Sequence, residues 1–325
     1  KYLNSLNHSL SKLLSENNDL FLMGQDIKDP YGGAFKVTKN LSINFPDRVL
    51  NMPISESGII GFATGLVLNN NKVISEIMFS AEENVLRQTQ YAQLAIFIHS
   101  TIIFDLIKDR KECVAVAGHS LGEFSALYAN NFFDFETGLQ IVDVRARAMH
   151  ECELNNPGKM NDVIGVSIDK IQTICDSVDC QIANINSDTQ IVISGSEESI
   201  DLASESLKNI GSKVIPLSVS GAFHSKLMSD AKNKLTDIIN TSNFNEVSFP
   251  IVSNFNAKPN RSIEKIKHAL IEQIDNPVQW SKSIKSLGKL SNEFVEIGPK
   301  KVLSNIIKKI DDSLTITTYN SIENL

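Results

Sequence analysis

The chain has 325 residues, 42% of them hydrophobic and 21% charged, and a formal net charge of −7. This composition is typical of a soluble globular protein, and the length suggests about two domains. The acidic balance argues against a nucleic-acid-binding surface. The longest apolar stretch, near 92–104, is too short to span a bilayer. Because the N-terminal residues also lack a signal-peptide pattern, we expect a cytoplasmic protein without membrane or nucleic-acid partners.

Four cysteines have neither the spacing of a disulfide framework nor that of a zinc site. We therefore expect reduced thiols and no bound metal. Lysines gather near the C-terminus, at 300, 301, 308 and 309. They form either a solvated helix face or a docking patch for an acidic partner.

Short β-rich runs alternate with longer helical patterns, which indicates an α/β architecture. In chain order, we expect strands at 20–23, 73–79, 113–117, 190–194, 213–217, 247–252 and 294–297. Helices are expected at 58–68, 84–106, 121–130, 135–153, 198–209, 225–241 and 263–274.

The stretch 163–219 has the pattern of a separate small unit. It predicts strand, helix, strand, strand, helix and strand, at 163–167, 168–175, 181–185, 190–194, 200–210 and 213–217. This β-α-β-β-α-β order is ferredoxin-like. We therefore expect a hydrolase-like parallel-sheet body with an inserted ferredoxin-like subdomain, at about 160–219, and a cleft between them.

Residues 114–122 carry the clearest chemical signal. An apolar run leads into Gly118-His119-Ser120-Leu121-Gly122, and a helical pattern follows at once. Strand, Gly-x-Ser-x-Gly and helix form a nucleophile elbow, which lifts the serine hydroxyl above the sheet. The two glycines would allow a tight turn that a Cβ blocks. Ser120 is therefore a candidate nucleophile, and a purely structural β-α turn is the alternative.

A serine hydroxyl needs an adjacent base, and His224 is the best candidate. It lies in the loop-like stretch 219–225, where small residues leave room around the backbone. No acid between Ser120 and His224 has a context suited to orienting the histidine. These residues by themselves leave open which group orients the histidine.

From about residue 84 to 320 the chain resembles the malonyl-CoA:acyl-carrier-protein transacylases, the acyltransferases of fatty-acid and polyketide synthesis. The similar segments are collinear: QTQYAQLAIF (88–97), AGHSLGEFSALYA (117–129), VDVRARAMHE (142–151), NINSDTQIVISG (184–195), SVSGAFHSKLM (218–228), NPVQW (276–280) and FVEIGPKKVL (294–303). The resemblance implies transfer of a malonyl group from malonyl-CoA to the phosphopantetheine thiol of acyl carrier protein. A malonyl-serine would be the intermediate, and no tightly bound cofactor would be needed.

The same resemblance implies roles for individual residues. Ser120 and His224 would form a catalytic dyad instead of a triad, because the backbone carbonyl of Gln279 would orient the histidine in place of an acid. The Leu121 amide would bind the oxyanion. Arg145 would hold the free carboxylate of the malonyl group through its planar fork. Such a bond contributes roughly 1.5–3 kcal/mol, which favours malonyl over acetyl about tenfold or more.

Four further residues align with the substrate pocket of that family. Phe223 would crowd a branched acyl group. Gln93 would lie near the acyl pocket, or would be a paired core glutamine. Asn184 and Asn186 would line the path of the thioester arm, or would only form a turn.

Residues 21–80 resemble a different family, the N-terminal part of the β subunits of thiamine-diphosphate-dependent 2-oxo-acid dehydrogenases. The similar segments are FLMGQDIKDPYGGAFKVTKNL (21–41), RVLNMPISESGIIGFATGLVL (48–68) and EIMFS (76–80). In that family the glutamate corresponding to Glu56 contacts the cofactor's aminopyrimidine. The resemblance stops near Ser80, so we expect no thiamine diphosphate chemistry. The expected domains are a partial α/β segment of this family at 1–80 and the acyltransferase domain at 81–325.

The acyltransferase family normally begins with a strand and a Gly-Gln-Gly-Ser-Gln turn, which supplies a second oxyanion-hole amide. That turn does not occur here in its usual form. Gly24-Gln25 either substitutes for it, with the Gln25 amide as the donor, or simply ends a strand of the dehydrogenase-like segment.

Two other functions stay open on the sequence. A serine acyl hydrolase would use Ser120 and His224 and would gain nothing from Arg145. A catalytically impaired fusion or truncation product would act as a binding protein.

Overall fold

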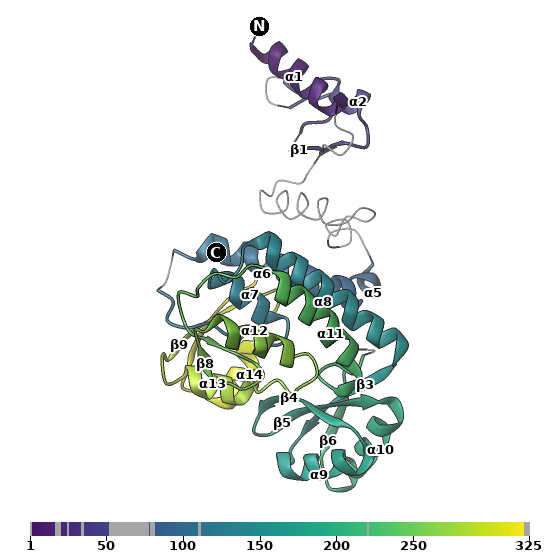
Figure 1. The fold of residues 1–325 in the computed structure, drawn as a ribbon, viewed down its shortest axis with the longest axis vertical. Coiled ribbons are helices and arrows are strands. Elements are labelled where there is room, and N and C mark those ends of the chain that lie inside the picture. Colours follow the sequence, from purple (N-terminus) through teal and green to yellow (C-terminus); the bar gives the residue numbers. More distant parts are fainter. Residues whose placement is uncertain are drawn as a thin grey trace. The chain divides into compact units, whose positions relative to one another are not determined.

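The computed structural model describes residues 2–16, 21–24, 26–33, 36–51, 78, 82–109, 112–219 and 221–321. Contacts divide the chain into two compact units, Lys1–Glu82 and Glu83–Leu325 (Figure 1). The helix expected at 58–68 lies outside the described residues. So does the strand expected at 73–79, apart from residue 78.

The first unit combines two helices with a small parallel sheet. Its elements are α1 (Tyr2–Glu16), β1 (Leu22–Gly24), α2 (Leu41–Asn44) and β2 (Val49–Asn51). β1 pairs in parallel with β2. Leu14, Leu41 and Val49 form the core, and the Arg48 guanidinium donates to the Leu14 carbonyl at 2.7 Å. Gly24 therefore ends a strand of this unit's own sheet.

Helices form much of the second unit. They are α5 (Glu83–Leu86), α6 (Thr89–Ile107), α7 (Gly122–Ala129), α8 (Phe135–Asn155), α11 (Ser229–Thr241), α12 (Ile263–Glu272), α13 (Trp280–Leu287) and α14 (Val302–Ile310). The helix expected at 84–106 is divided, because Gln88 adopts an extended backbone and caps α6. α13 and α14 were not expected from the sequence.

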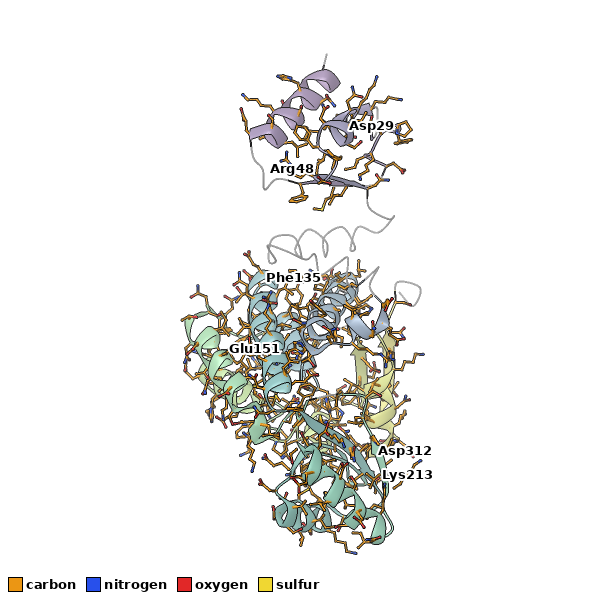
Figure 2. The ribbon with its side chains drawn as sticks, turned by 90° about the vertical axis from the view of Figure 1, so that its right-hand side faces the viewer. Asp29, Arg48, Phe135, Glu151, Lys213 and Asp312 are labelled. Carbon is orange, nitrogen blue, oxygen red and sulfur yellow. The ribbon has the colours of Figure 1, made fainter. Side chains whose placement is uncertain are left out.

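The long helices α6, α8 and α11 pack side by side (Figure 1). Phe135 of α8 stacks on Phe97 of α6 with ring centroids 5.9 Å apart, and Glu151 of α8 pairs with Lys234 of α11 (Figure 2). α6 has the length and apolar composition to cross a membrane. Because one face packs on α7 and α8, we interpret it as a core helix.

The strands of the body are short. β7 (Ile251–Val252) pairs with β8 (Pro259–Asn260), and β9 (Glu293–Ile297) pairs in parallel with β10 (Thr315–Tyr319). The strand expected at 113–117 forms a single parallel bridge, Val116 to Ile251. The strand expected at 247–252 begins only at Ile251, because Pro250 has no N–H to donate to a ladder. Val116 and Ile251 nevertheless bring the elbow beside β7.

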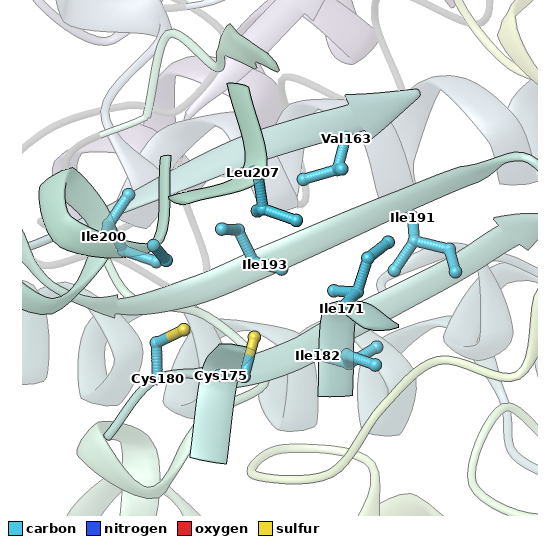
Figure 3. Close-up of a cluster of buried hydrophobic side chains, with 10 residues drawn as sticks. Val163, Ile171, Cys175, Cys180, Ile182, Ile191, Ile193, Ile200 and Leu207 are labelled. Atoms are coloured by element: carbon cyan, nitrogen blue, oxygen red, sulfur yellow. The ribbon is translucent and has the colours of Figure 1, made fainter. Parts of the chain in front are cut away.

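The ferredoxin-like subdomain is confirmed. Its elements are β3 (Gly158–Ile164), α9 (Ile168–Val178), β4 (Gln181–Ser187), β5 (Gln190–Ser196), α10 (Glu197–Asn209) and β6 (Lys213–Pro216). The antiparallel strands have the order β4-β5-β3-β6. Isoleucines of the sheet pack against α9 and α10 (Figure 3).

The first strand of this subdomain begins five residues earlier than expected and ends at Ile164, whereas the sequence predicted 163–167. The start of β3 is hard to predict because polar residues interrupt its apolar pattern. Asn161 and Asp162 are buried in β3, and their side chains bond to Ser204 at 2.7 Å and Gln190 at 2.6 Å. Long-range partners of this kind leave no local trace in the sequence.

Candidate active site

Ser120 stands in a strained turn between Val116 and α7. Its φ of 51° lies in the left-handed region, which costs a non-glycine residue of order 1 kcal/mol or more. Gly118 permits the turn, because a Cβ there would lie 1.9 Å from the backbone of Gly122. The elbow expected from the sequence is therefore present.

The second glycine of the motif has a different status. A Cβ on Gly122 would meet nothing within 4 Å. The prediction that both glycines exclude a Cβ is therefore wrong for Gly122. This residue opens α7, where an ordinary helical backbone suits any small side chain.

His224 is in place to act on Ser120. The distance from Ser120 Oγ to His224 Nε2 is 2.9 Å, and that from His224 Nδ1 to the Gln273 carbonyl oxygen is 2.8 Å. A carbonyl only accepts, so Nδ1 carries the proton and Nε2 is left as the acceptor for the serine hydroxyl. This tautomer, assigned from the partners, is the one that a general base needs.

Gln273, and not Gln279, orients the histidine. Gln273 follows the last residue of α12, where carbonyls have no partner within the helix and can accept other donors. Gln279 instead precedes α13, and its carbonyl accepts from the Ser283 amide at 2.9 Å. The assignment of this role to Gln279 is therefore wrong. Helix polarity could have favoured Gln273, since a carbonyl that starts a helix is already used.

Burial keeps His224 neutral. The side chain is 3% exposed, and desolvation, helped by the nearby Arg145 charge, lowers its pKa to about 3. The imidazole is thus available as a proton acceptor at neutral pH. His224 also has a left-handed backbone, with φ 56°.

Arg145 is buried beside the candidate nucleophile. It is 1% exposed, and its Nη2 lies 3.1 Å from both Ser120 Oγ and Gln273 Oε1. Its Nη1 donates to Gln93 Oε1. Burial lowers its pKa to about 10, so the guanidinium remains charged at neutral pH. Its Nε has no hydrogen-bond partner among the described residues. A buried cation with a spare donor is suited to an anionic ligand.

A polar network that the sequence did not reveal supports these groups. Asn254 Oδ1 accepts from the Ser120 amide at 2.6 Å, and its Nδ2 donates to the Gly118 carbonyl at 2.5 Å. Glu123 Oε2 accepts from the Asn254 amide at 3.1 Å and from Gln273 Nε2 at 2.6 Å. The position of Glu123 in Gly-His-Ser-Leu-Gly-Glu, facing inward from α7, was the available hint.

A cavity of about 1360 Å³ joins the site to the subdomain. Besides Ser120, His224 and Arg145, its walls include other residues expected at the substrate: Gln93, Leu121, Asn184, Asn186 and Phe223. The structure thus brings all of these residues into one cleft.

The two asparagines are strand residues of β4 and not turn formers. Asn186 Oδ1 lies 2.9 Å from Nε2 of His119, so a side-chain bond joins the subdomain to the elbow. Asn184 is buried, and its Oδ1 has no hydrogen-bond partner among the described residues. That oxygen is a buried acceptor without a donor, in a residue that borders the cavity.

The expected oxyanion donors are the backbone amides of Leu121 and Gln25. The Leu121 amide lies directly after Ser120 and has no hydrogen bond within the described part of the chain. Gln25, the suggested second oxyanion donor, lies outside the described residues. So does Glu56, the residue suggested to contact thiamine diphosphate, and we derive no step through that cofactor. Among the described residues, no cluster of histidine, cysteine or acids could hold a metal ion.

Two lysines of the C-terminal group are used within the fold. Lys308 Nζ donates to the carbonyls of Asp312 and Leu314, and Lys309 Nζ donates to Gln190 at 3.0 Å. Lys309 therefore joins α14 to the subdomain. Lys300 is exposed and borders the cavity.

Comparison with known families agrees with this geometry. Residues 68–323 match the family described as "Acyl transferase domain", and residues 1–101 match "Transketolase, pyrimidine binding domain". The chain belongs to the acyl transferase family.

Within that family, its relatives are malonyl CoA-acyl carrier protein transacylases. The chain is 37% identical to the Staphylococcus aureus protein of that name over 259 residues, which cover 78% of this chain and 84% of the relative.

Solved structures of proteins with this activity are similar to this chain. An acyl-carrier-protein S-malonyltransferase from Bartonella henselae has a TM-score of 0.77 and 29% identity, over 82% of this chain and 88% of that one. A malonyl-transacylase in complex with a type II polyketide-synthase acyl-carrier protein has a TM-score of 0.78 and 28% identity. It matches over 94% of this chain and 97% of that one.

The two glycines of the elbow should respond differently to alanine. Gly118→Ala should lower the free energy of unfolding by about 1–3 kcal/mol or more, because the new methyl group meets backbone. Gly122→Ala, the matched control, should change it by less than about 1 kcal/mol. Urea denaturation measures both. Equal stabilities of the two variants would show that the backbone approach at Gly118 is not tight.

Proposed function

We propose that the protein transfers a malonyl group from malonyl-CoA to the phosphopantetheine thiol of an acyl carrier protein, with Ser120 as the nucleophile. The main observation behind this proposal is that Ser120 Oγ lies 2.9 Å from His224 Nε2 and 3.1 Å from Arg145 Nη2. The names of the relatives support the substrates, and the relative solved with its carrier protein supports the partner.

Arg145 explains the choice of acyl group. In a malonyl thioester the free carboxylate is one methylene away from the carbonyl carbon that the serine attacks. A guanidinium within hydrogen-bond distance of the serine hydroxyl is therefore suited to a short dicarboxylic acyl group. Because Arg145 is already buried, its bond to a carboxylate replaces contacts with neutral Gln93 and Gln273.

In the first half-reaction, His224 Nε2 takes the hydroxyl proton as Ser120 Oγ attacks the thioester carbonyl. The Leu121 amide stabilises the oxyanion. Loss of one such donor typically costs about 10²–10³ in turnover. When the C–S bond breaks, the coenzyme A thiolate takes the proton from His224 and leaves a malonyl-serine ester.

The second half-reaction runs the same steps in reverse with a different thiol. The phosphopantetheine thiol gives its proton to His224 and attacks the ester carbonyl. Ser120 leaves and recovers the proton, and the carrier protein departs as a malonyl thioester. The chain's own groups complete both steps, so this mechanism requires neither a metal nor thiamine diphosphate.

The thioester arm would pass along β4. We propose that the partnerless Asn184 Oδ1 accepts from an amide of the arm, and that the aromatic ring of Phe223 restricts branching at the acyl group. After coenzyme A has left, the narrow cleft between body and subdomain limits the access of water to the malonyl-serine ester. Coenzyme A thioesters as substrates support the cytoplasm as the place of action.

The competing functions have less support. A hydrolase of neutral acyl groups would leave the buried Arg145 without a ligand, and the relatives are transferases. A binding protein without turnover does not require Ser120 and His224 to be in hydrogen-bond contact.

Acylation is the direct test. Incubation of the protein with malonyl-CoA should raise its intact mass by one malonyl group, and the increase should be lost in Ser120→Ala. Addition of holo acyl carrier protein should then discharge the label to the carrier thiol. A folded protein that takes up no malonyl group would refute the enzyme assignment, and discharge to water alone would favour a hydrolase.

Arg145 should set the preference for malonyl. Arg145→Met should reduce the ratio of kcat/KM for malonyl-CoA to that for acetyl-CoA about tenfold or more, because a charged hydrogen bond contributes roughly 1.5–3 kcal/mol. Arg147→Met is the matched control, since Arg147 is exposed and pairs with Asp143 on the same helix. An unchanged ratio in Arg145→Met would remove the arginine from substrate recognition.

In the pH profile of kcat/KM, the acid limb should lie at a lower pH than an ordinary histidine base would give. Burial and Arg145 lower the His224 pKa to about 3 from its usual 6.5. The neutral base therefore persists as the pH falls, and kcat/KM should decline only well below pH 6.5. Steady-state rates, with circular dichroism at each pH as a folding control, measure this. A decline centred at or above pH 6.5 would contradict the assigned environment.

A further inference from the structure

Glu123 is a fully buried carboxyl group that the transfer mechanism does not use. Its exposed fraction is 0%, and it lies in the first turn of α7, three residues after Ser120. Burial of a carboxyl group carries a large desolvation cost unless hydrogen bonds offset it. Its partners therefore indicate what it does.

One oxygen of Glu123 receives two hydrogen bonds. Oε2 accepts from the Asn254 amide at 3.1 Å and from Gln273 Nε2 at 2.6 Å. The other oxygen, Oε1, has no hydrogen-bond partner among the described residues. A single acceptor atom thus joins the segment after β7 to the end of α12.

Each of these two partners holds a reacting residue directly. Asn254 Oδ1 accepts from the Ser120 amide at 2.6 Å. The Gln273 carbonyl accepts from His224 Nδ1 at 2.8 Å. Gln273 Nε2 also donates to the Ser120 carbonyl at 3.2 Å. The distance between nucleophile and base therefore depends on how Gln273 is placed against Asn254 and Ser120, and Glu123 Oε2 fixes Gln273 relative to Asn254.

We propose that Glu123 is a positioning residue, whose acceptor oxygen aligns Ser120 with His224 through Asn254 and Gln273. Glu123 does this through the length of its side chain and the hydrogen bonds that Oε2 accepts, and its negative charge is not required. The inference rests on the proposed transfer reaction, because the aligned pair is the one that reacts there.

Charge is the rival explanation, since the buried Arg145 of α8 interacts electrostatically with Glu123. Among the described residues, Arg145 is the charged group that faces Glu123, and the other neighbours are neutral: the Ser253 hydroxyl, the Asn254 backbone amide and the Gln273 side-chain amide. Gln273 bridges the two, donating to Glu123 at 2.6 Å and accepting from Arg145 at 3.1 Å. Burial raises the Glu123 pKa to about 7, so an effect through charge would change the rate near neutral pH.

Three variants separate the two explanations. Glu123→Gln removes the charge and keeps a carbonyl oxygen that can accept both bonds. Glu123→Asp keeps the charge but withdraws the oxygen by one methylene. Glu123→Leu removes both. Glu136→Leu, at an exposed acid in the first turn of α8, is the control.

We expect Glu123→Gln to retain kcat within about threefold, with the acid limb of wild type. Glu123→Asp and Glu123→Leu should lose kcat about tenfold or more, with KM for malonyl-CoA nearly unchanged, because the substrate contacts stay in place. Transfer to holo acyl carrier protein gives both constants, and thermal melting establishes that each variant is folded. If Glu123→Leu does not fold, the comparison of Gln with Asp decides.

Three results would overturn the proposal. Equal loss in Glu123→Gln and Glu123→Asp, or a pH limb near 7 that only Glu123→Gln abolishes, would assign the effect to charge or to packing. Wild-type kcat in Glu123→Asp or Glu123→Leu would remove any positioning role. All three results require an active wild-type protein. An inactive wild type would instead refute the transfer reaction.

Discussion

The hydrogen bond from His224 Nδ1 to the Gln273 carbonyl is the constraint on which the rest of the site depends. It fixes the imidazole tautomer, so that Nε2 can accept the proton of Ser120. It also brings the end of α12 against the elbow, where the Gln273 side chain contacts Arg145 and Glu123. One residue thus relates His224, the buried Arg145 guanidinium and the first turn of α7. A carbonyl can serve this purpose because it stands at a helix end, where no amide of the helix competes for it.

Burial gives the same groups their chemical character. Removed from water, His224 stays neutral and Arg145 stays charged, and the Arg145 charge disfavours protonation of the imidazole. The ferredoxin-like subdomain contributes to this enclosure through His119 and Asn186, which bond across the cleft. The neutral imidazole and the buried guanidinium therefore depend on the same exclusion of solvent.

Local patterns predicted much of this arrangement. The elbow around Ser120 follows from a short motif, and the β-α-β-β-α-β order predicted the subdomain correctly. The loop-like setting of His224 favoured it as the base, whereas the role of Arg145 came from the family resemblance, because its helical pattern left both an exposed and a buried position open. What failed depends on distant partners. The 113–117 strand was overestimated because only Val116 finds a ladder partner, and β3 was misplaced because Ser204 and Gln190 satisfy its buried polar residues. The role of Gln279 also came from the resemblance, and nothing local in the sequence showed that the Gln273 carbonyl, at the end of α12, lies against His224.

At Ser120 and His224, a low-strain backbone and a functional side chain favour different residues. Both have φ near 50–60°, a conformation that glycine adopts at little cost and that a side chain with a Cβ resists. At each position, the residue best suited to the backbone is therefore the one without a functional group. Selection for thermal stability alone would favour glycine at both positions, and the hydroxyl and the imidazole would be lost. Because both side chains are present, favourable packing elsewhere, such as that of the isoleucines inside the subdomain, offsets the strain.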